Sequence, residues 1–127
     1  MSTSILTSMK KVLNLAEDDT AFDMDVMMHV NSAISRLSQL GVGPADGFMI
    51  EDAEATWETF LGSDPRLNDI KSFVYLYVKL LFDPPQTGFG TTAIEKQIEK
   101  YEWLINVRRE DKEWTDPLAP VTVLIED

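Results

Sequence analysis

Few residues of this chain could carry out chemistry, and the first to consider is the single histidine, His29. A zinc site of the usual kind needs several histidine or cysteine ligands, and the chain has no cysteine and no second histidine. His29 precedes Val30 near the apolar side of a predicted helix. We therefore interpret His29 as a residue at the edge of the core, and no catalytic dyad can be built around it.

A group of acidic residues before and inside the same helix is the candidate for a calcium site. Its members are Glu17, Asp18, Asp19, Asp23 and Asp25. A calcium-binding loop of the EF-hand type has about 12 residues, with a glycine at the sixth position and a glutamate at the last. No loop that starts at one of these aspartates has either residue in place. Helix capping and solvation explain the group better.

Two glycines precede the last predicted helix in the segment Gly88-Phe89-Gly90-Thr91-Thr92. A phosphate-binding loop needs a strand before it and a lysine after its glycines, and this segment has neither. The chain also lacks the patterns G-x-S-x-G and H-E-x-x-H. The sequence therefore predicts no enzymatic activity, no cofactor and no metal site.

The element that must organise the fold is the apolar segment from about 65 to 82. Most of its positions are aliphatic or aromatic, and a helix that is apolar on most sides must be the central one. Ser63 or Asp64 can cap its start, and Pro84 ends it. Strand is the rival structure for the stretch FVYLYV, but the segment length and the caps favour helix. The stripe that we expect to be its only exposed one consists of Lys71, Tyr75 and Lys79.

Two helices are expected before this segment in the first third of the chain. Residues 4–15 have the apolar spacing of a short amphipathic helix. A longer helix is predicted over about 22–40, with Asp19 or Thr20 as its N-cap and with Gly41 or Gly43, before Pro44, at its end.

Two further helices flank the central one. A short helix is expected over about 52–62, after a piece over 47–50 that could be extended. After the central helix we expect a flexible loop over 86–90, and then a last helix that is capped by Thr91 or Thr92 and runs to about Glu110. The prediction is an all-α bundle of four to five helices with an extended C-terminal arm.

The last helix has one side that is unusual for a surface. Its core side should carry Ile94, Ile98, Tyr101, Leu104 and Ile105. At 100° per residue, Trp103 and Val107 point the opposite way, among charged residues. Either a partner covers this face, or the C-terminal tail folds back over it.

The composition changes near Asp111, where two prolines appear and the helical period ends. We expect a helical domain over 1–110 and an arm over 111–127. A single strand is suggested by an alternating pattern, in which Val121, Val123 and Ile125 are separated by Thr122 and Leu124 and followed by Glu126. Such a strand could pair with an edge in another subunit, and the alternative is a disordered acidic tail.

The overall composition limits the partners. The 127 residues include 11 basic and 22 acidic ones, which gives a net charge of −11, so a surface that grips phosphate is not expected. No apolar run reaches the roughly 20 residues that span a bilayer. We expect a soluble protein that is made in the cytoplasm. The methionines, which fill core gaps or form adaptable surfaces, include Met24, Met27, Met28 and Met49.

Several segments in order resemble a known family. They are MKKVLNLAEDDTAFDMDVMMHVNSAISRLSQLGVGP, then TWETFLG, then YVKLLFDPP with a glycine-containing loop, and then EWLIN. Together, over about Met9 to Val107, they resemble the small head-tail connector proteins of long-tailed phages and prophages. These proteins are also called head-completion or adaptor proteins and are often labelled DNA-packaging proteins.

The resemblance implies a structural virion protein that is made in the host bacterial cytoplasm. Its subunits would form a cyclic ring, dodecameric in the virion, below the portal protein, and would offer neck or tail-completion proteins a docking surface. DNA would pass through the ring without sequence-specific binding, and no membrane would be involved. The residues expected at interfaces are Asp83, Pro84, Pro85, Phe89, Trp103, Val107, Trp114, Val121, Val123 and Ile125.

A different class of protein fits the composition as well. A small acidic helical regulator could bind one protein partner as a monomer or dimer. Both a regulator and a connector would lack a set of catalytic residues, so this absence does not distinguish the two hypotheses. Assembly on a portal ring would distinguish them, because only a connector should assemble there.

Overall fold

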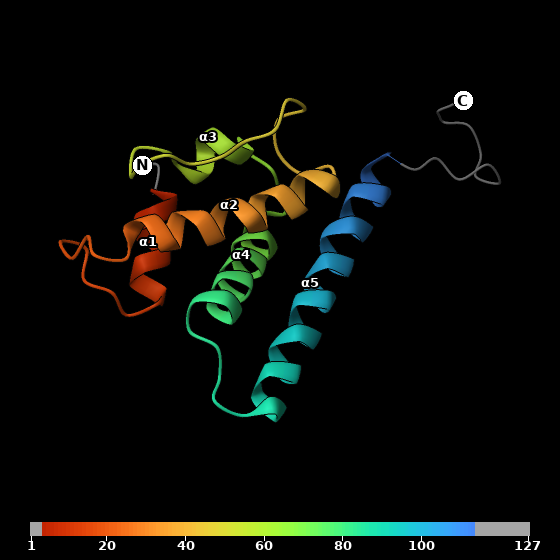
Figure 1. Ribbon diagram of the computed structural model, residues 1–127. Helices are drawn as coiled ribbons and strands as arrows, with labels where there is room; N and C mark the ends of the chain where they lie inside the picture. The colour runs from red at the N-terminus through yellow and green to blue at the C-terminus, as the bar shows by residue number, and fades with distance from the viewer. Residues whose placement is uncertain (1–3, 114–127) are drawn as a thin grey trace, which may run out of the picture.

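The computed structural model describes residues 4–113, with side chains described up to Val107. It contains five helices, and no strand occurs within the described part (Figure 1). The helices are α1 (Ile5–Val12), α2 (Asp23–Gln39), α3 (Trp57–Leu61), α4 (Leu67–Phe82) and α5 (Gly88–Glu113). The predicted all-α bundle is confirmed. Residues 114–127 of the predicted arm lie outside the described residues.

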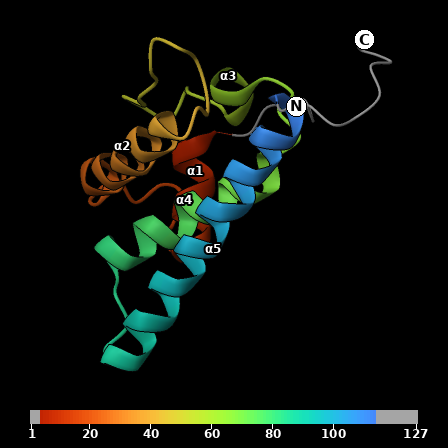
Figure 2. The ribbon, with the colours of Figure 1, turned by 90° about the vertical axis from the view of Figure 1, so that its right-hand side faces the viewer.

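Helix α4 is the centre of the bundle, as its apolar sequence requires. It packs against α2 on one side and against α5 on another, and the two views show α4 and α5 running side by side to a turn at one end (Figures 1 and 2). The side chains that α4 buries are Ile70, Phe73, Val74 and Val78. Four large side chains on one helix anchor both neighbours.

The start and the surface of α4 differ in detail from the prediction. The helix begins at Leu67, because Asp64 first closes a turn in which its Oδ1 accepts from the Arg66 amide at 2.8 Å. The expected exposed stripe is half-buried, and Lys71 lies over the Trp57 ring at 5.6 Å. Neighbouring helices therefore cover the stripe that helical spacing alone left open.

The N-terminal caps follow the predicted chemistry only in part. Ser4 caps α1, since its Oγ accepts from the Thr7 amide at 3.1 Å. The prediction that Asp19 or Thr20 caps α2 was wrong: α2 begins at Asp23 and has no side-chain cap. Asp19 instead accepts from the Ala21 amide at 3.0 Å within the preceding turn.

The end of α2 shows why glycine was needed there. Gly41 has φ 81°, a left-handed conformation that glycine adopts at low cost. Its amide donates to the Ser38 carbonyl, and the Val42 amide donates to the Leu37 carbonyl, each at 3.0 Å. This is a Schellman motif, and the buried Val42 completes it with an apolar contact.

The segment between α2 and α3 is irregular. The predicted helix start near Asp52 was wrong, because α3 begins at Trp57 with Thr56 as its N-cap. Asp52 closes a turn by accepting from the Glu54 amide at 2.8 Å. The piece over 47–50 forms no strand, and Ile50 is held by two hydrogen bonds with the Asn31 side chain, at 2.7 and 2.9 Å.

A buried lysine fastens α1 to the start of α2. Lys10 is 3% exposed. Its Nζ donates to the carbonyls of Glu17 and Asp19 at 2.9 and 2.7 Å and lies 2.8 Å from Asp23 Oδ1. Three oxygens around one ammonium group compensate for its loss of water. The acidic segment that was considered for calcium therefore uses two backbone carbonyls and one carboxylate to hold a lysine.

Candidate interaction surfaces

The turn between α4 and α5 exposes several of the residues predicted to lie at interfaces. Asp83 is exposed; its amide donates to the Lys79 carbonyl at 2.9 Å and its carboxylate accepts from Lys79 Nζ at 3.2 Å. Pro84 is exposed and Pro85 is half-buried. Phe89 is 89% exposed, which is the largest value among the exposed large hydrophobic side chains of the described residues. A phenylalanine in that position contributes little to folding and much apolar area to a contact.

The flexible loop predicted over 86–90 is shorter than expected, because α5 already begins at Gly88. Thr87, and not Thr91 or Thr92, supplies the cap: its Oγ1 accepts from the Gly90 amide at 3.0 Å. A Cβ at Gly90 would lie 2.8 Å from Pro85 Cβ. The glycine thus allows the turn to pack tightly, and the helix presents Phe89 on a defined backbone.

The outer face of α5 carries the other two interface candidates within the described residues. Trp103 is 63% exposed, and Val107 is half-buried. Lys96 and Lys100 lie on the same side at helical spacing and are exposed. Among the described residues, therefore, most of the Trp103 side chain is left uncovered.

Polar contacts fix how α5 presents this face. Arg36 on α2 grips Glu102 with two hydrogen bonds, at 2.8 and 3.2 Å, and these hydrogen bonds and the negative charge of Glu102 raise the pKa of Arg36 above its ordinary value. Arg66 Nη1 donates to the Ile105 carbonyl at 3.4 Å. Ile105 is fully buried. The back of α5 is therefore held to α2 and α4 at the level of Trp103.

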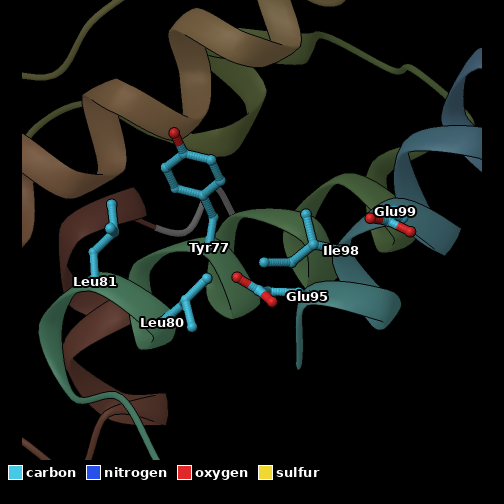
Figure 3. A pocket seen from close by; sticks show the side chains of 6 residues that line it. All are labelled: Tyr77, Leu80, Leu81, Glu95, Ile98 and Glu99. Carbon is cyan, nitrogen blue, oxygen red and sulfur yellow. The ribbon is translucent and has the colours of Figure 1, made fainter. Parts of the chain in front are cut away.

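A groove opens between α4 and α5 nearer to the turn. Its volume is about 440 Å³. Its walls are formed by Tyr77, Leu80, Leu81, Glu95, Ile98 and Glu99. Figure 3 shows Leu80 and Ile98 on opposite sides, with Glu95 between them in that view. The groove combines an apolar floor with two exposed carboxylates on the α5 side.

Methionines of α2 and of the segment that follows it form a second apolar area. Met24, Met28 and Met49 are 73%, 57% and 60% exposed. With Met27 and Ile50 among its neighbours, this area lines a hollow of about 300 Å³. The sequence left two uses open for these four methionines, and three of them lie on the surface and do not fill the core. Flexible thioethers on a surface adapt to differently shaped partners.

His29 lies beside an aromatic pair at the junction of α2 and α4. Its ring is 6.5 Å from the Phe82 ring, and Phe82 meets Phe22 edge to face at 5.6 Å. His29 is half-buried, as a residue at the core edge should be. Among residues 4–113 no three histidine, cysteine or acidic residues gather as a metal site would need, and none of the helices there has the length and apolarity to cross a membrane.

Three apolar residues of the predicted helices 4–15, 22–40 and 65–82 were not expected to be exposed. They are Val12, Phe22 and Leu81, which are 45%, 43% and 47% exposed. A helical pattern marks a side chain as apolar but does not say whether a neighbour covers it. The remaining interface candidates, Trp114, Val121, Val123 and Ile125, lie outside the described residues.

The fold and these surfaces define an all-helical interaction protein, with a firm core and exposed apolar side chains on separate faces. A family model described as phage connector protein matches residues 5–112, and the chain belongs to this family. Membership makes it a structural component of a phage virion that connects head and tail and contacts other head and tail proteins. Comparison with curated proteins and with solved structures gave no significant match.

Proposed function

We propose that the chain is a head-completion subunit that forms a cyclic ring below the portal protein and offers its other side to neck or tail-completion proteins. The observation that carries this proposal is the family match over residues 5–112, which includes all of the first four helices and nearly all of α5. The ring, its copy number and the identity of the docking proteins are parts of the proposal.

The distribution of apolar surface supports a subunit with several contacts. Phe89 at the start of α5, Trp103 farther along α5 and Met24 on α2 are each more than 60% exposed and lie at three separate places on the surface. A ring subunit between two other protein layers needs two lateral and two axial surfaces, and lateral contacts in a ring join different patches. In this proposal the turn of residues 83–90 contacts the lumen or a neighbouring subunit.

The charge supports a passive role toward DNA. A net charge of −11 repels phosphate, and Lys10, Arg36, Arg66 and Lys79 are each engaged by an acidic residue of the same chain. Such a surface holds no duplex by counterion release. We infer that DNA passes the ring without sequence-specific contacts.

The test is electron microscopy of the purified protein mixed with its portal ring. We expect a second ring stacked on the portal, with the same axis. If no association occurs at any salt, magnesium or crowding condition that supports packaging, the proposed ring below the portal is wrong. When the second ring does stack on the portal, addition of the neck or tail-completion protein should extend the stack.

A further inference from the structure

Two lysines on α5 stand apart from the other cations of the described residues. Lys96 and Lys100 are exposed and make no ion pair there, and Lys11 is the only other lysine in that state. The two are four residues apart on one helix, a spacing at which like charges repel. In a chain with twice as many acids as bases, the two lysines form a narrow basic stripe that the exposed Glu95 and Glu99 border on one side.

The two lysines and Trp103 form a single stripe, which we call the α5 stripe. At 100° per residue they fall within an arc of about 60°. Trp103 is 63% exposed. A basic stripe with one large aromatic ring fits a surface that offers carboxylates beside an apolar recess.

The groove between α4 and α5 has these two properties. Leu80, Leu81 and Ile98 supply the apolar part, and Glu95 and Glu99 supply exposed carboxylates. Its volume of about 440 Å³ is sufficient for an indole ring and part of a lysine side chain. The groove is therefore complementary to the α5 stripe in both charge and polarity.

We propose that the α5 stripe of one subunit docks into the α4–α5 groove of a second copy of this chain. The stripe and the groove are different patches, so the contact is heterologous and can continue from subunit to subunit around a ring. Charge complementarity selects a second copy over the chain's own residues 114–127, because that segment has three acidic residues and no basic one to meet Glu95 and Glu99. The inference rests on the proposed ring and names its lateral contact.

The chain has no cysteine, so single introduced thiols can test this contact. The full-length variant Leu81→Cys is mixed under oxidising conditions with a larger, tagged Lys100→Cys variant. We expect the mixed disulfide to exceed each homodisulfide several-fold. The control replaces the first variant by Ser63→Cys, an exposed position outside both patches. A mixed product no more abundant than with this control overturns the proposal.

Charge exchange provides the second measurement. In the Lys100→Cys copy, Lys96→Glu should lower the yield of mixed disulfide. When the Leu81→Cys copy also carries Glu95→Lys and Glu99→Lys, the yield should return. We expect a recovery on the order of tenfold when like-charge contacts become attractive again. If the yield of mixed disulfide is the same with and without these charge changes, the proposal is contradicted.

Thiol labelling of Leu81→Cys distinguishes the occupants of the groove. Protection that grows with protein concentration, or that appears when the ring forms on the portal, supports a second copy. Protection that is already complete in the dilute monomer means that residues 114–127 cover the groove, and it overturns the proposal. If a ring stacks on the portal while Leu81→Cys stays reactive, the lateral contact is wrong and the connector role stands. If the disulfide forms but no ring stacks, only the proposed ring on the portal fails.

Discussion

The body of the molecule and the outer end of its α4–α5 hairpin are built from similar residues but are fastened very differently. The body, residues 4–78, contains all the buried apolar side chains of the described residues except Ile105, and its Lys10, Asn31 and Trp57 each make hydrogen bonds across different segments. From Lys79 to Leu104 no side chain is fully buried. The only ion pair within the outer turn joins Lys79 to Asp83 among the described residues.

This difference indicates that the body provides stability and that the hairpin end provides surface for contacts with other proteins. Buried apolar area provides most of the folding free energy, so the body carries stability. The hairpin end exposes Phe89 and Leu81 and contains the groove, so substitutions there should change contacts with other proteins far more than folding. Truncation of a residue that packs or fastens the helices should therefore lower the free energy of unfolding more than truncation of a matched residue without such contacts.

The largest effect is expected from Phe73→Ala. Phe73 is a fully buried residue of α4, and its truncation should lower the free energy of unfolding by about 3–5 kcal/mol. Urea denaturation followed by circular dichroism measures this loss. The matched control is Phe89→Ala, where 89% exposure leaves little to lose, and we expect a change within about 0.5 kcal/mol. Equal losses in the two variants would remove the distinction between body and hairpin end.

The second prediction concerns the lysine that holds α1 to α2. Lys10→Met keeps the length of the side chain but leaves two carbonyls and the Asp23 carboxylate without their donor. We expect a loss of about 2–3 kcal/mol, the range for a buried polar group that loses its partner. Lys11→Met is the control, because Lys11 is exposed on the same helix and should change stability by only a few tenths of a kcal/mol.

If Lys10→Met were as stable as Lys11→Met, the buried ammonium would be replaceable by apolar contact. Hydrogen exchange gives an independent readout. The amides of the segment 13–22 should exchange faster in Lys10→Met, because the lysine is what ties the Glu17 and Asp19 carbonyls to α1.

A smaller effect is expected where α5 meets α2. Glu102→Gln removes the charge that Arg36 grips, and because both side chains are partly exposed we expect a loss of only about 0.3–1 kcal/mol. Glu102 raises the pKa of Arg36, so this contribution is present while Arg36 is protonated and disappears only as the pH rises through that raised pKa, at strongly alkaline pH. Arg36 stays protonated between about pH 6 and 9, so its titration should not change the difference in the free energy of unfolding between Glu102→Gln and the parent protein over that range.

Thermal unfolding of the parent, Glu102→Gln and Glu99→Gln measures this contribution. Glu99 is one turn earlier on the same helix and forms no ion pair within the described residues, so its variant should match the parent. A loss in Glu99→Gln as large as in Glu102→Gln would mean that general charge, and not the α2–α5 grip, sets the stability.

The sequence predicted best those features that depend only on residues close together in the chain. The apolar length of the central segment predicted a helix that both neighbours contact, and Pro84 predicted its end. A glycine stop of α2, at Gly41 or Gly43, and the exposed Trp103 were also predicted, because each depends on local spacing, and the structure assigns the stop to Gly41. Such features need no knowledge of what lies across the molecule.

The errors have one physical origin, which is competition from other segments. Asp19 and Asp52 are good capping residues, yet each closes a turn before the helix that it was expected to start. Thr87 caps α5 one turn before the predicted threonines, so glycines expected in a loop are helical. The groove could not be predicted at all, because its walls come from two helices whose rotation about their axes is fixed only by packing.

The smallest expected effect comes from His29, the one residue with a side chain suited to catalysis near neutral pH. His29→Ala removes a half-buried ring that contacts Phe82, so the free energy of unfolding should fall by no more than about 1 kcal/mol. The exposed Ser35→Ala on the same helix should have no measurable effect. Stacking of the ring on the portal, scored by electron microscopy, should be unchanged in both variants, because packing at the core edge is the only role that the structure gives His29. A variant that folds with nearly parental stability but no longer assembles would place His29 in a contact with another subunit, and the boundary between body and interaction surface would then move to include α2.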